Sequence, residues 1–169
     1  MLDVVLVRHA IAEEPDAAAR AGRSEAQRRL TAAGRRKMEA AAAGLRRVLP
    51  EAGRIASSPL VRARETAAIL AHAYESAAPT ETDRLAPGFD PAGLLDWLHG
   101  QGADTTPVIL VGHEPDLGRW VAWCTGCGAG TPVVFKKGTA CRLEVGAPGE
   151  GRIRWLLTPR QLRALGEGA

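Results

Sequence analysis

The 169-residue sequence is poor in aromatic residues and has no long apolar segment. Phe, Trp and Tyr make up 4% of it, so a buried core must be built mainly from Ala, Val, Leu and Ile. No segment approaches the roughly 20 apolar residues of a membrane span. The apolar run Val4–Val7 is short and follows an acid, whereas a signal peptide has a basic start and a longer apolar region. We therefore expect a cytoplasmic protein without membrane association.

Lysine is also scarce, and the only lysines are Lys37, Lys136 and Lys137. The formal net charge is +3, and nearly all of the positive charge is arginine. No dense run of basic residues with interleaved aromatics occurs, so we expect no nucleic-acid partner. Arginine is informative where it lies in a pocket, because a guanidinium binds two phosphate oxygens at once.

Cysteine occurs three times, at Cys124, Cys127 and Cys141. Cys124 and Cys127 have the spacing of a thioredoxin-like redox motif, but such a motif opens a helix after a strand. Here the pair follows a helical pattern that includes Leu117 and Val121. We expect reduced thiols, with a thiol-redox role as a distant alternative. No second paired spacing supports a zinc site, and we expect neither a metal nor another cofactor.

The length fits one domain, residues 1–169. Short apolar runs alternate with amphipathic stretches, which predicts βαβ units of the α/β class around a parallel or mixed sheet. Strands are expected at Val4–Val7, Arg54–Ala56, Thr80–Leu85 and Val108–Val111. A polar loop is expected between the first strand and about Leu30.

Helix starts are marked by capping residues and prolines. Thr31, Asp90-Pro91 and Glu114-Pro115 begin three expected helices, and Ser58 is expected to cap a fourth with Pro59 at its first position.

The last third of the chain has a different pattern from the alternation of strands and helices before it. Thr139–Val145 and Arg152–Leu157 flank a Gly/Pro-rich turn, which predicts a hairpin, and Thr158-Pro159 begins a short closing helix.

Arginine and histidine, residue types that can bind phosphate, follow three of the expected strands. Arg8 and His9 end the first strand, Arg62 lies one turn after the second, and His113 ends the central one. Ligands of open α/β sheets bind at the carboxyl ends of strands. Each residue alone has an ordinary structural interpretation, but together they describe an anion site. Guanidinium groups would repel a metal ion there.

Four segments, in order, resemble the motifs of the histidine phosphatase superfamily. Leu6–Ala10 resembles its Arg-His-Gly signature, with Ala10 in place of glycine. Ser57–Thr66 and Val111–Pro115 resemble its second and third motifs, and Arg29–Gly34 resembles the Leu-Thr-x-x-Gly before its first helix. The resemblance implies a phosphoglycerate mutase-like fold: a three-layer α/β/α domain with a mostly parallel sheet and an antiparallel C-terminal portion.

The resemblance also implies roles for individual residues. Neutral His9 would attack phosphorus and form a phosphohistidine intermediate, which water then hydrolyses. Arg8, Arg62 and His113 would hold the phosphoryl oxygens. His113 should become protonated when phosphate is bound, because a neighbouring dianion raises the pKa of an imidazole.

The short chain and the segment Leu85–Gly88 are similar to the SixA-type phosphohistidine phosphatase branch of that superfamily. Larger members carry a proton-donating acid where this sequence has Pro87 and Gly88. SixA-like proteins place an arginine before "Leu-Thr", which Arg28 or Arg29 would supply, either to the phosphate or to an acidic partner. Ser58 is a further candidate for phosphate binding.

The missing acid favours substrates with a P–N bond, because imidazole is a far less basic leaving group than an alkoxide. We therefore expect a monomeric phosphatase whose partner is a phosphorylated substrate, with a phosphohistidine-bearing protein domain favoured. A carboxylate could still serve as proton donor, and the candidates are Glu13, Glu14, Asp90 and Glu114. The alternatives are a small-molecule phosphomonoesterase of the same superfamily and a non-catalytic module that binds phosphate or phosphoproteins.

Overall fold

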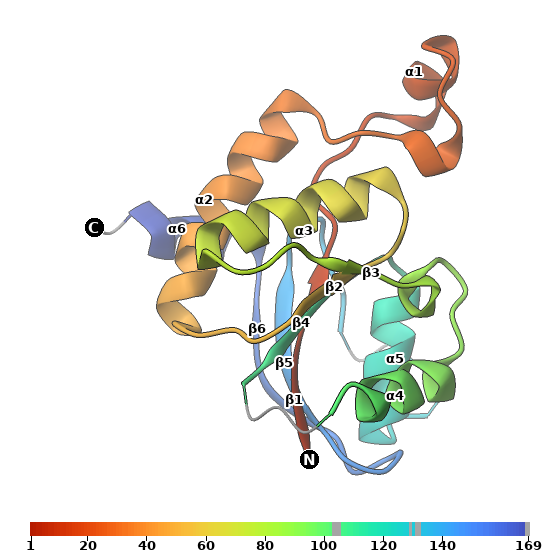
Figure 1. Cartoon of the computed structure of the whole chain (residues 1–169), viewed down its shortest axis with the longest axis vertical. Helices are drawn as coiled ribbons and strands as arrows, with labels where there is room; N and C mark the ends of the chain where they lie inside the picture. Colours follow the sequence, from red (N-terminus) through yellow and green to blue (C-terminus); the bar gives the residue numbers. More distant parts are fainter. Residues whose placement is uncertain (103–105, 129, 131–132, 168–169) are drawn as a thin grey trace.

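The computed structural model describes residues 1–102, 106–128, 130 and 133–167, and its centre is a six-stranded sheet (Figure 1). The strand order is β3-β2-β4-β1-β5-β6. Four strands are mutually parallel: β1 (Leu2–Arg8), β2 (Ile55–Ser57), β3 (Thr80–Glu81) and β4 (Val108–Gly112). β5 (Ala140–Val145) and β6 (Arg152–Leu157) are antiparallel. The prediction of a mostly parallel sheet with an antiparallel C-terminal portion is confirmed.

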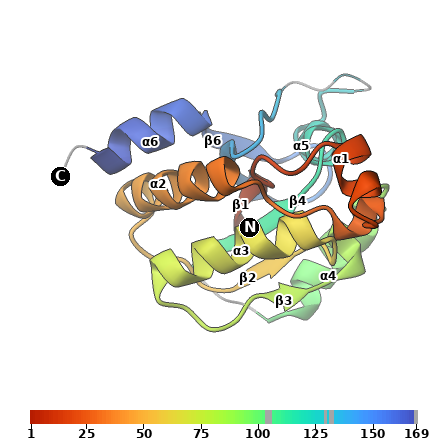
Figure 2. The ribbon, with the colours of Figure 1, turned by 90° about the horizontal axis from the view of Figure 1, so that it is seen from above.

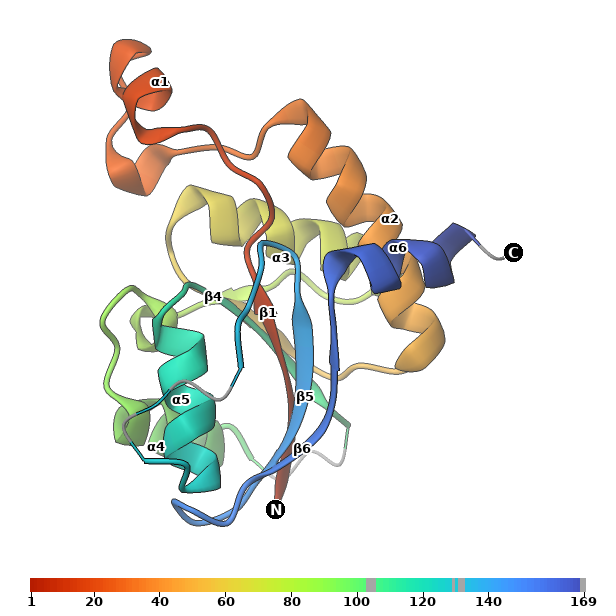
Figure 3. The same ribbon diagram turned by 180° about the vertical axis from the view of Figure 1, so that it is seen from behind.

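Helices cover both faces of this sheet (Figures 2 and 3). Successive residues of a strand point to opposite faces, so Val5 and Val7 pack in one core while Val4 and Leu6 pack in the other. The first core is covered by α2 (Ala32–Val48), α3 (Val61–Tyr74) and α6 (Pro159–Glu167). The second is covered by α4 (Pro91–Gly100) and α5 (Asp116–Thr125). This is the expected α/β/α layering.

Two of the expected caps are found. The Thr31 hydroxyl accepts a hydrogen bond from the Gly34 amide at 2.9 Å, at the start of α2. The Asp90 carboxylate accepts one from the Gly93 amide at 2.8 Å, at the start of α4. Each cap satisfies an amide that has no partner within its helix.

The prediction that Ser58 caps α3 with Pro59 at its first position is wrong. α3 begins at Val61, after Leu60, because the Ser58 hydroxyl is engaged elsewhere. It lies 2.8 Å from Nε2 of His113 and also accepts a hydrogen bond from the Leu60 amide. The chain therefore makes an extra turn between β2 and α3.

The region expected to be a polar loop contains two short helices, which the sequence analysis missed. They are α1 (Pro15–Arg20) and the 3-10 helix η1 (Glu25–Gln27). The segment 12–30, here called the arm, rises beyond the carboxyl end of β1 (Figure 1). A β-bridge between Ala12 and Leu30 closes its base.

The segment Thr80–Leu85 is a strand only at its first two residues. β3 ends at Glu81, and a 3-10 helix, η2 (Asp83–Leu85), follows with Thr82 as its cap. β3 lies at the edge of the sheet and both of its residues are exposed, so buried side chains do not stabilise a longer strand there. In the described part of the chain, no helix is long and apolar enough to cross a membrane.

Candidate active site

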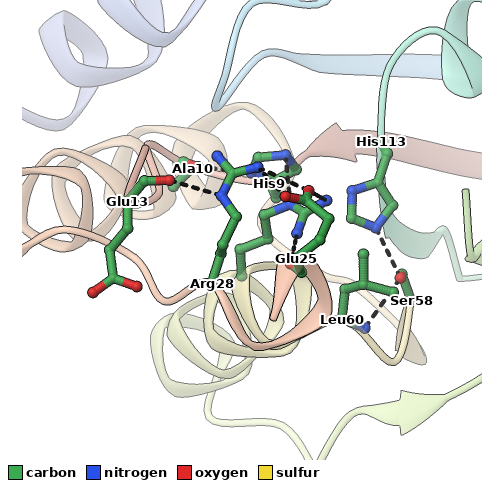
Figure 4. A network of polar contacts seen from close by, with 9 residues as sticks. His9, Ala10, Glu13, Glu25, Arg28, Ser58, Leu60 and His113 are labelled. Carbon is green, nitrogen blue, oxygen red and sulfur yellow. Dashed lines mark hydrogen bonds and ion pairs between the residues drawn. The ribbon is translucent and has the colours of Figure 1, made fainter. Parts of the chain in front are cut away.

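A cavity of about 330 Å³ opens at the carboxyl ends of the parallel strands. Its wall includes the four residues that the sequence analysis placed there, together with Arg28 of the arm. The lining residues are Arg8, His9, Glu25, Arg28, Leu60, Arg62, Pro87, His113 and Glu114. Ser58 is not among these lining residues, and its hydroxyl lies 2.8 Å from Nε2 of His113 (Figure 4).

His9 presents one ring nitrogen as an acceptor. Its Nδ1 lies 2.8 Å from the Ala10 carbonyl oxygen, which can only accept, so Nδ1 carries the proton. In the neutral ring Nε2 therefore holds a lone pair, and Arg62 donates a hydrogen bond to it from Nε at 3.3 Å. Burial lowers the pKa of His9 to about 3, and His113 and the two arginines act in the same direction. His9 is thus neutral at physiological pH, and its lone pair lies on Nε2.

Arg62 is held from both ends of its side chain. The residue is only 5% exposed. Its guanidinium donates from Nη1 to the Glu25 carbonyl oxygen at 2.9 Å. At the backbone, the Thr66 hydroxyl donates to the Arg62 carbonyl at 2.7 Å and accepts from the Ala10 amide at 3.0 Å. Thr66 therefore ties the start of α3 to the end of β1, which fixes Arg62 beside His9.

His113 lies beside His9, with ring centroids 5.2 Å apart and ring planes inclined by 53°. The Ser58 hydroxyl accepts from Leu60, so its proton is available for Nε2 of His113. When the hydroxyl donates to Nε2, the neutral His113 ring carries its own proton on Nδ1. Burial lowers the pKa of His113 to about 3, with further contributions from Arg62 and Arg8.

Two buried nitrogen atoms of the site have no hydrogen-bond partner within the described residues: Nδ1 of His113 and Nε of Arg8. The rest of Arg8 is fixed, since Nη1 donates to the Phe135 carbonyl at 2.6 Å. Burial lowers the pKa of Arg8, while Glu114 opposes this. Buried polar atoms almost always have partners, so these two donors favour an anionic ligand in the cavity.

Of the four carboxylates considered from the sequence, only Glu114 lines the cavity. Its two oxygens accept hydrogen bonds from the Gly118 and Phe135 amides, at 3.1 and 2.9 Å. Asp90 caps α4, as described above. Pro87, which the motif resemblance places where larger members carry an acid, lies on the wall.

The other two carboxylates belong to the arm and lie outside the cavity. Glu13 binds Arg23 and the Arg29 amide, and the hydrogen bonds from Arg23 and Arg29 lower its pKa. Glu14 precedes α1 and is exposed. The choice between Arg28 and Arg29 is also resolved here, because only Arg28 lines the cavity.

Glu25 was missed by the sequence analysis. Its carboxylate forms ion pairs with Nη2 of Arg62 at 3.1 Å and with Nη1 of Arg28 at 2.8 Å (Figure 4). Arg28 is also fixed by a hydrogen bond from Nε to the Glu13 carbonyl at 2.8 Å. The available signal was weak: a Glu three residues before an Arg, in a polar segment without an apolar period.

The cysteines and possible metal ligands do not form a second site in the described residues. Cys124 is buried within α5, and burial raises the pKa of its thiol to about 12. Cys127 follows the C-terminal end of that helix and is exposed, so neither thiol lies at a helix N-terminus. No group of three or more His, Cys, Asp or Glu side chains is placed to hold a metal ion in this part of the chain.

Comparison with known families gives a match for the first half of the chain. The model of the histidine phosphatase superfamily, branch 1, matches residues 4–86. The resemblance to this superfamily is therefore confirmed. An uncharacterized protein of Picosynechococcus sp. is 38% identical over 94 residues, which are 55% of this chain and 57% of that protein. The match thus spans little more than half the length of this relative.

Solved structures of phosphatases share the fold along nearly the whole chain. The protein histidine phosphatase SixA, complexed with tungstate, superposes with a TM-score of 0.80 at 23% identity, covering 95% of this chain and 99% of that one. A putative SixA from Agrobacterium tumefaciens gives 0.73 at 23%, covering 94% and 98%. A mycobacterial glucosyl-3-phosphoglycerate phosphatase gives 0.66 at 20%, covering 94% and 100%. These likenesses confirm the phosphoglycerate mutase-like fold.

Proposed function

We propose that the protein is a phosphatase that uses His9 as its nucleophile, and that it acts on phosphohistidine in proteins. The observation that carries the proposal is the state of His9. Its Nε2 has a lone pair, fixed by the Nδ1 contact to Ala10, in a cavity that also holds three arginines. A neutral nucleophile among cationic groups suits attack on an anionic phosphoryl group.

In the first step, the Nε2 lone pair of His9 forms a bond to phosphorus, and the bond from phosphorus to the leaving group breaks. The electron pair of the broken bond goes to the departing nitrogen or oxygen. Arg8, Arg62 and His113 donate hydrogen bonds to the phosphoryl oxygens, which offsets their charge in the transition state. Nε of Arg8 and Nδ1 of His113 are available for this purpose, since neither has a partner among the described residues.

In the second step, a water oxygen attacks the phosphoryl group on His9. The P–Nε2 bond breaks, its electron pair returns to the imidazole, and inorganic phosphate leaves. The phosphate dianion beside His113 raises the pKa of that imidazole, so His113 is protonated while phosphate is bound.

The substrate assignment rests on the leaving group. A departing imidazole needs less assistance from an acid than a departing alkoxide does. The position of the usual acid is occupied by Pro87, and both oxygens of Glu114 accept backbone amide hydrogen bonds. The fold shared with protein histidine phosphatase SixA supports the same assignment. A single domain, a monomer and a cytoplasmic location stay predictions of the sequence.

A second candidate function is hydrolysis of a small phosphate monoester. It is favoured by the presence of two carboxylates, Glu25 and Glu114, on the cavity wall. The fold is also shared with a glucosyl-3-phosphoglycerate phosphatase.

The test compares kcat/KM for a phosphohistidine peptide and for a sugar monophosphate. We expect a preference for the peptide, and loss of both activities in His9→Ala. His99→Ala is the matched control, because His99 is exposed on α4 and lies outside the cavity. A preference for the sugar phosphate would replace the first function by the second. No turnover of either substrate would favour a non-catalytic phosphate-binding module.

A further inference from the structure

The carboxylate of Glu25 already pairs with two of the arginines that line the cavity. It pairs with Nη2 of Arg62 at 3.1 Å and with Nη1 of Arg28 at 2.8 Å. The Glu25 carbonyl oxygen accepts from Nη1 of Arg62 at 2.9 Å. Both terminal nitrogens of Arg62 therefore contact Glu25, while Nε of Arg8 and Nδ1 of His113 have no hydrogen-bond partner in the described residues.

The Glu25 carboxylate lies 3.1 Å from Nη2 of Arg62, on the guanidinium that the proposed function assigns to the phosphoryl group. A phosphoryl group bound to that guanidinium would lie beside a second anion, and the two would repel each other. Movement of the Glu25 carboxylate away from Arg62 therefore favours binding of the phosphoryl group.

We propose that Glu25 is a specificity-determining residue that acts as an internal competitor for the phosphoryl group. In the resting site its carboxylate neutralises Arg62 and Arg28. A phosphorylated substrate displaces it, and it returns when inorganic phosphate leaves. The inference rests on the proposed function, since it assumes that the cavity binds a phosphoryl group.

The arm can release Glu25 at low cost. The Glu25 side chain is 59% exposed, whereas the Arg62 side chain is 6% exposed. An ion pair with one exposed partner contributes little, and the freed carboxylate would be hydrated at once. The arm keeps its own anchors, because the bridge between Ala12 and Leu30 and the contacts of Glu13 do not involve Glu25. The carboxylate can therefore move without unfolding the arm.

This competition selects for phosphoryl groups over weaker anions. The planar Glu25 carboxylate reaches the cavity from the arm, where it pairs with Arg62 and Arg28. A tetrahedral phosphoryl group has oxygens for the donors of Arg8 and His113 as well, and its greater charge strengthens each hydrogen bond. A simple carboxylate or a singly charged anion gains too little to displace Glu25. The same competition weakens the binding of product phosphate.

The test measures binding of inorganic phosphate by titration calorimetry, and its inhibition constant in the phosphatase assay. Glu25→Gln keeps the size of the side chain and removes its charge. We expect it to bind phosphate about three- to fivefold more tightly than the wild type, with Glu25→Ala changing in the same direction. Glu14→Gln is the matched control, because it removes a charge from the same arm outside the cavity. We expect it to change phosphate binding by less than about twofold.

The direction of the change separates this role from a structural one. If Glu25 only holds Arg62 in place, Glu25→Gln and Glu25→Ala will bind phosphate more weakly, and the inference is overturned. It is also overturned if both variants bind phosphate as the wild type does. If the wild type binds no phosphate and hydrolyses no phosphoryl substrate, the proposed function itself fails. If the wild type hydrolyses the substrate but both Glu25 variants bind phosphate as the wild type does, the inference about Glu25 fails and the proposed function stands.

Discussion

The two sides of the cavity differ in how firmly their residues are held. The sheet side, made of Arg8, His9, Arg62 and His113, extends from strand ends and from the start of α3, and both histidines and Arg62 are buried. The arm side, made of Glu25 and Arg28, comes from a 3-10 helix and its flanking residue. Transition-state stabilisation needs donors that are fixed beforehand. We therefore propose that the sheet side carries out the chemistry and that the arm side determines which anions bind.

The largest effect should come from removing a donor on the sheet side. We expect Arg62→Ala to lower kcat/KM by about a hundred- to thousandfold, because the transition state loses a buried charged donor next to His9. Steady-state kinetics with the phosphohistidine peptide measures this. Arg64→Ala is the control: Arg64 lies on the same helix and is exposed in an ion pair with Glu81. Equal losses in the two variants would contradict the separate role of Arg62.

The pH dependence of stability should show that the sheet side is buried. His9 and His113 have pKa values of about 3 in the folded protein, below the ordinary value of 6.5. The unfolded chain therefore binds more protons between these values, and the free energy of unfolding falls as the pH drops below 6.5. We expect a loss of about 4 kcal/mol between pH 7 and pH 5, about 2 kcal/mol from each histidine, measured by urea unfolding.

His113→Asn should remove about half of that loss, since one of the two histidines no longer takes up a proton on unfolding. His99→Asn, at an exposed position, should leave it unchanged. A free energy of unfolding that stays constant from pH 7 to pH 5 would show that the two rings are protonated alike in the folded and unfolded states.

The smallest effect is expected on the arm side. Arg28→Ala should raise KM about two- to fivefold with little change in kcat, because Arg28 contributes to binding and its ion-pair partner Glu25 is mostly exposed. Arg29→Ala is the neighbouring control outside the cavity. A fall in kcat as large as that of Arg62→Ala would remove the distinction between the two sides.

The difference between the two sides also explains what the sequence could predict. The sheet side was found because apolar strands end at Arg8-His9 and Gly112-His113, and parallel strands end at one edge of the sheet. The motif resemblance then added roles for these residues. Thr31 and Asp90 were found as caps because each accepts a hydrogen bond from the amide three residues later, a contact that the local sequence pattern encodes.

The failures occurred where side chains make distant contacts. Ser58 has the local pattern of a cap, but its hydroxyl contacts His113, which is 55 residues away in the sequence. Glu25 and the helices of the arm have no apolar period, because most of the arm is exposed. Only the folded chain brings Glu25 to Arg62, and no local pattern in the sequence encodes that contact.

The central claim is that the phosphoryl group passes through Nε2 of His9. The most direct measurement is to incubate the protein with a radiolabelled phosphohistidine peptide, quench the reaction in alkali and locate the label by fragmentation. The account predicts an acid-labile, alkali-stable phosphoryl group on His9, present in His99→Ala and absent in His9→Ala. Continued turnover by His9→Ala, or label on a different residue, would contradict it.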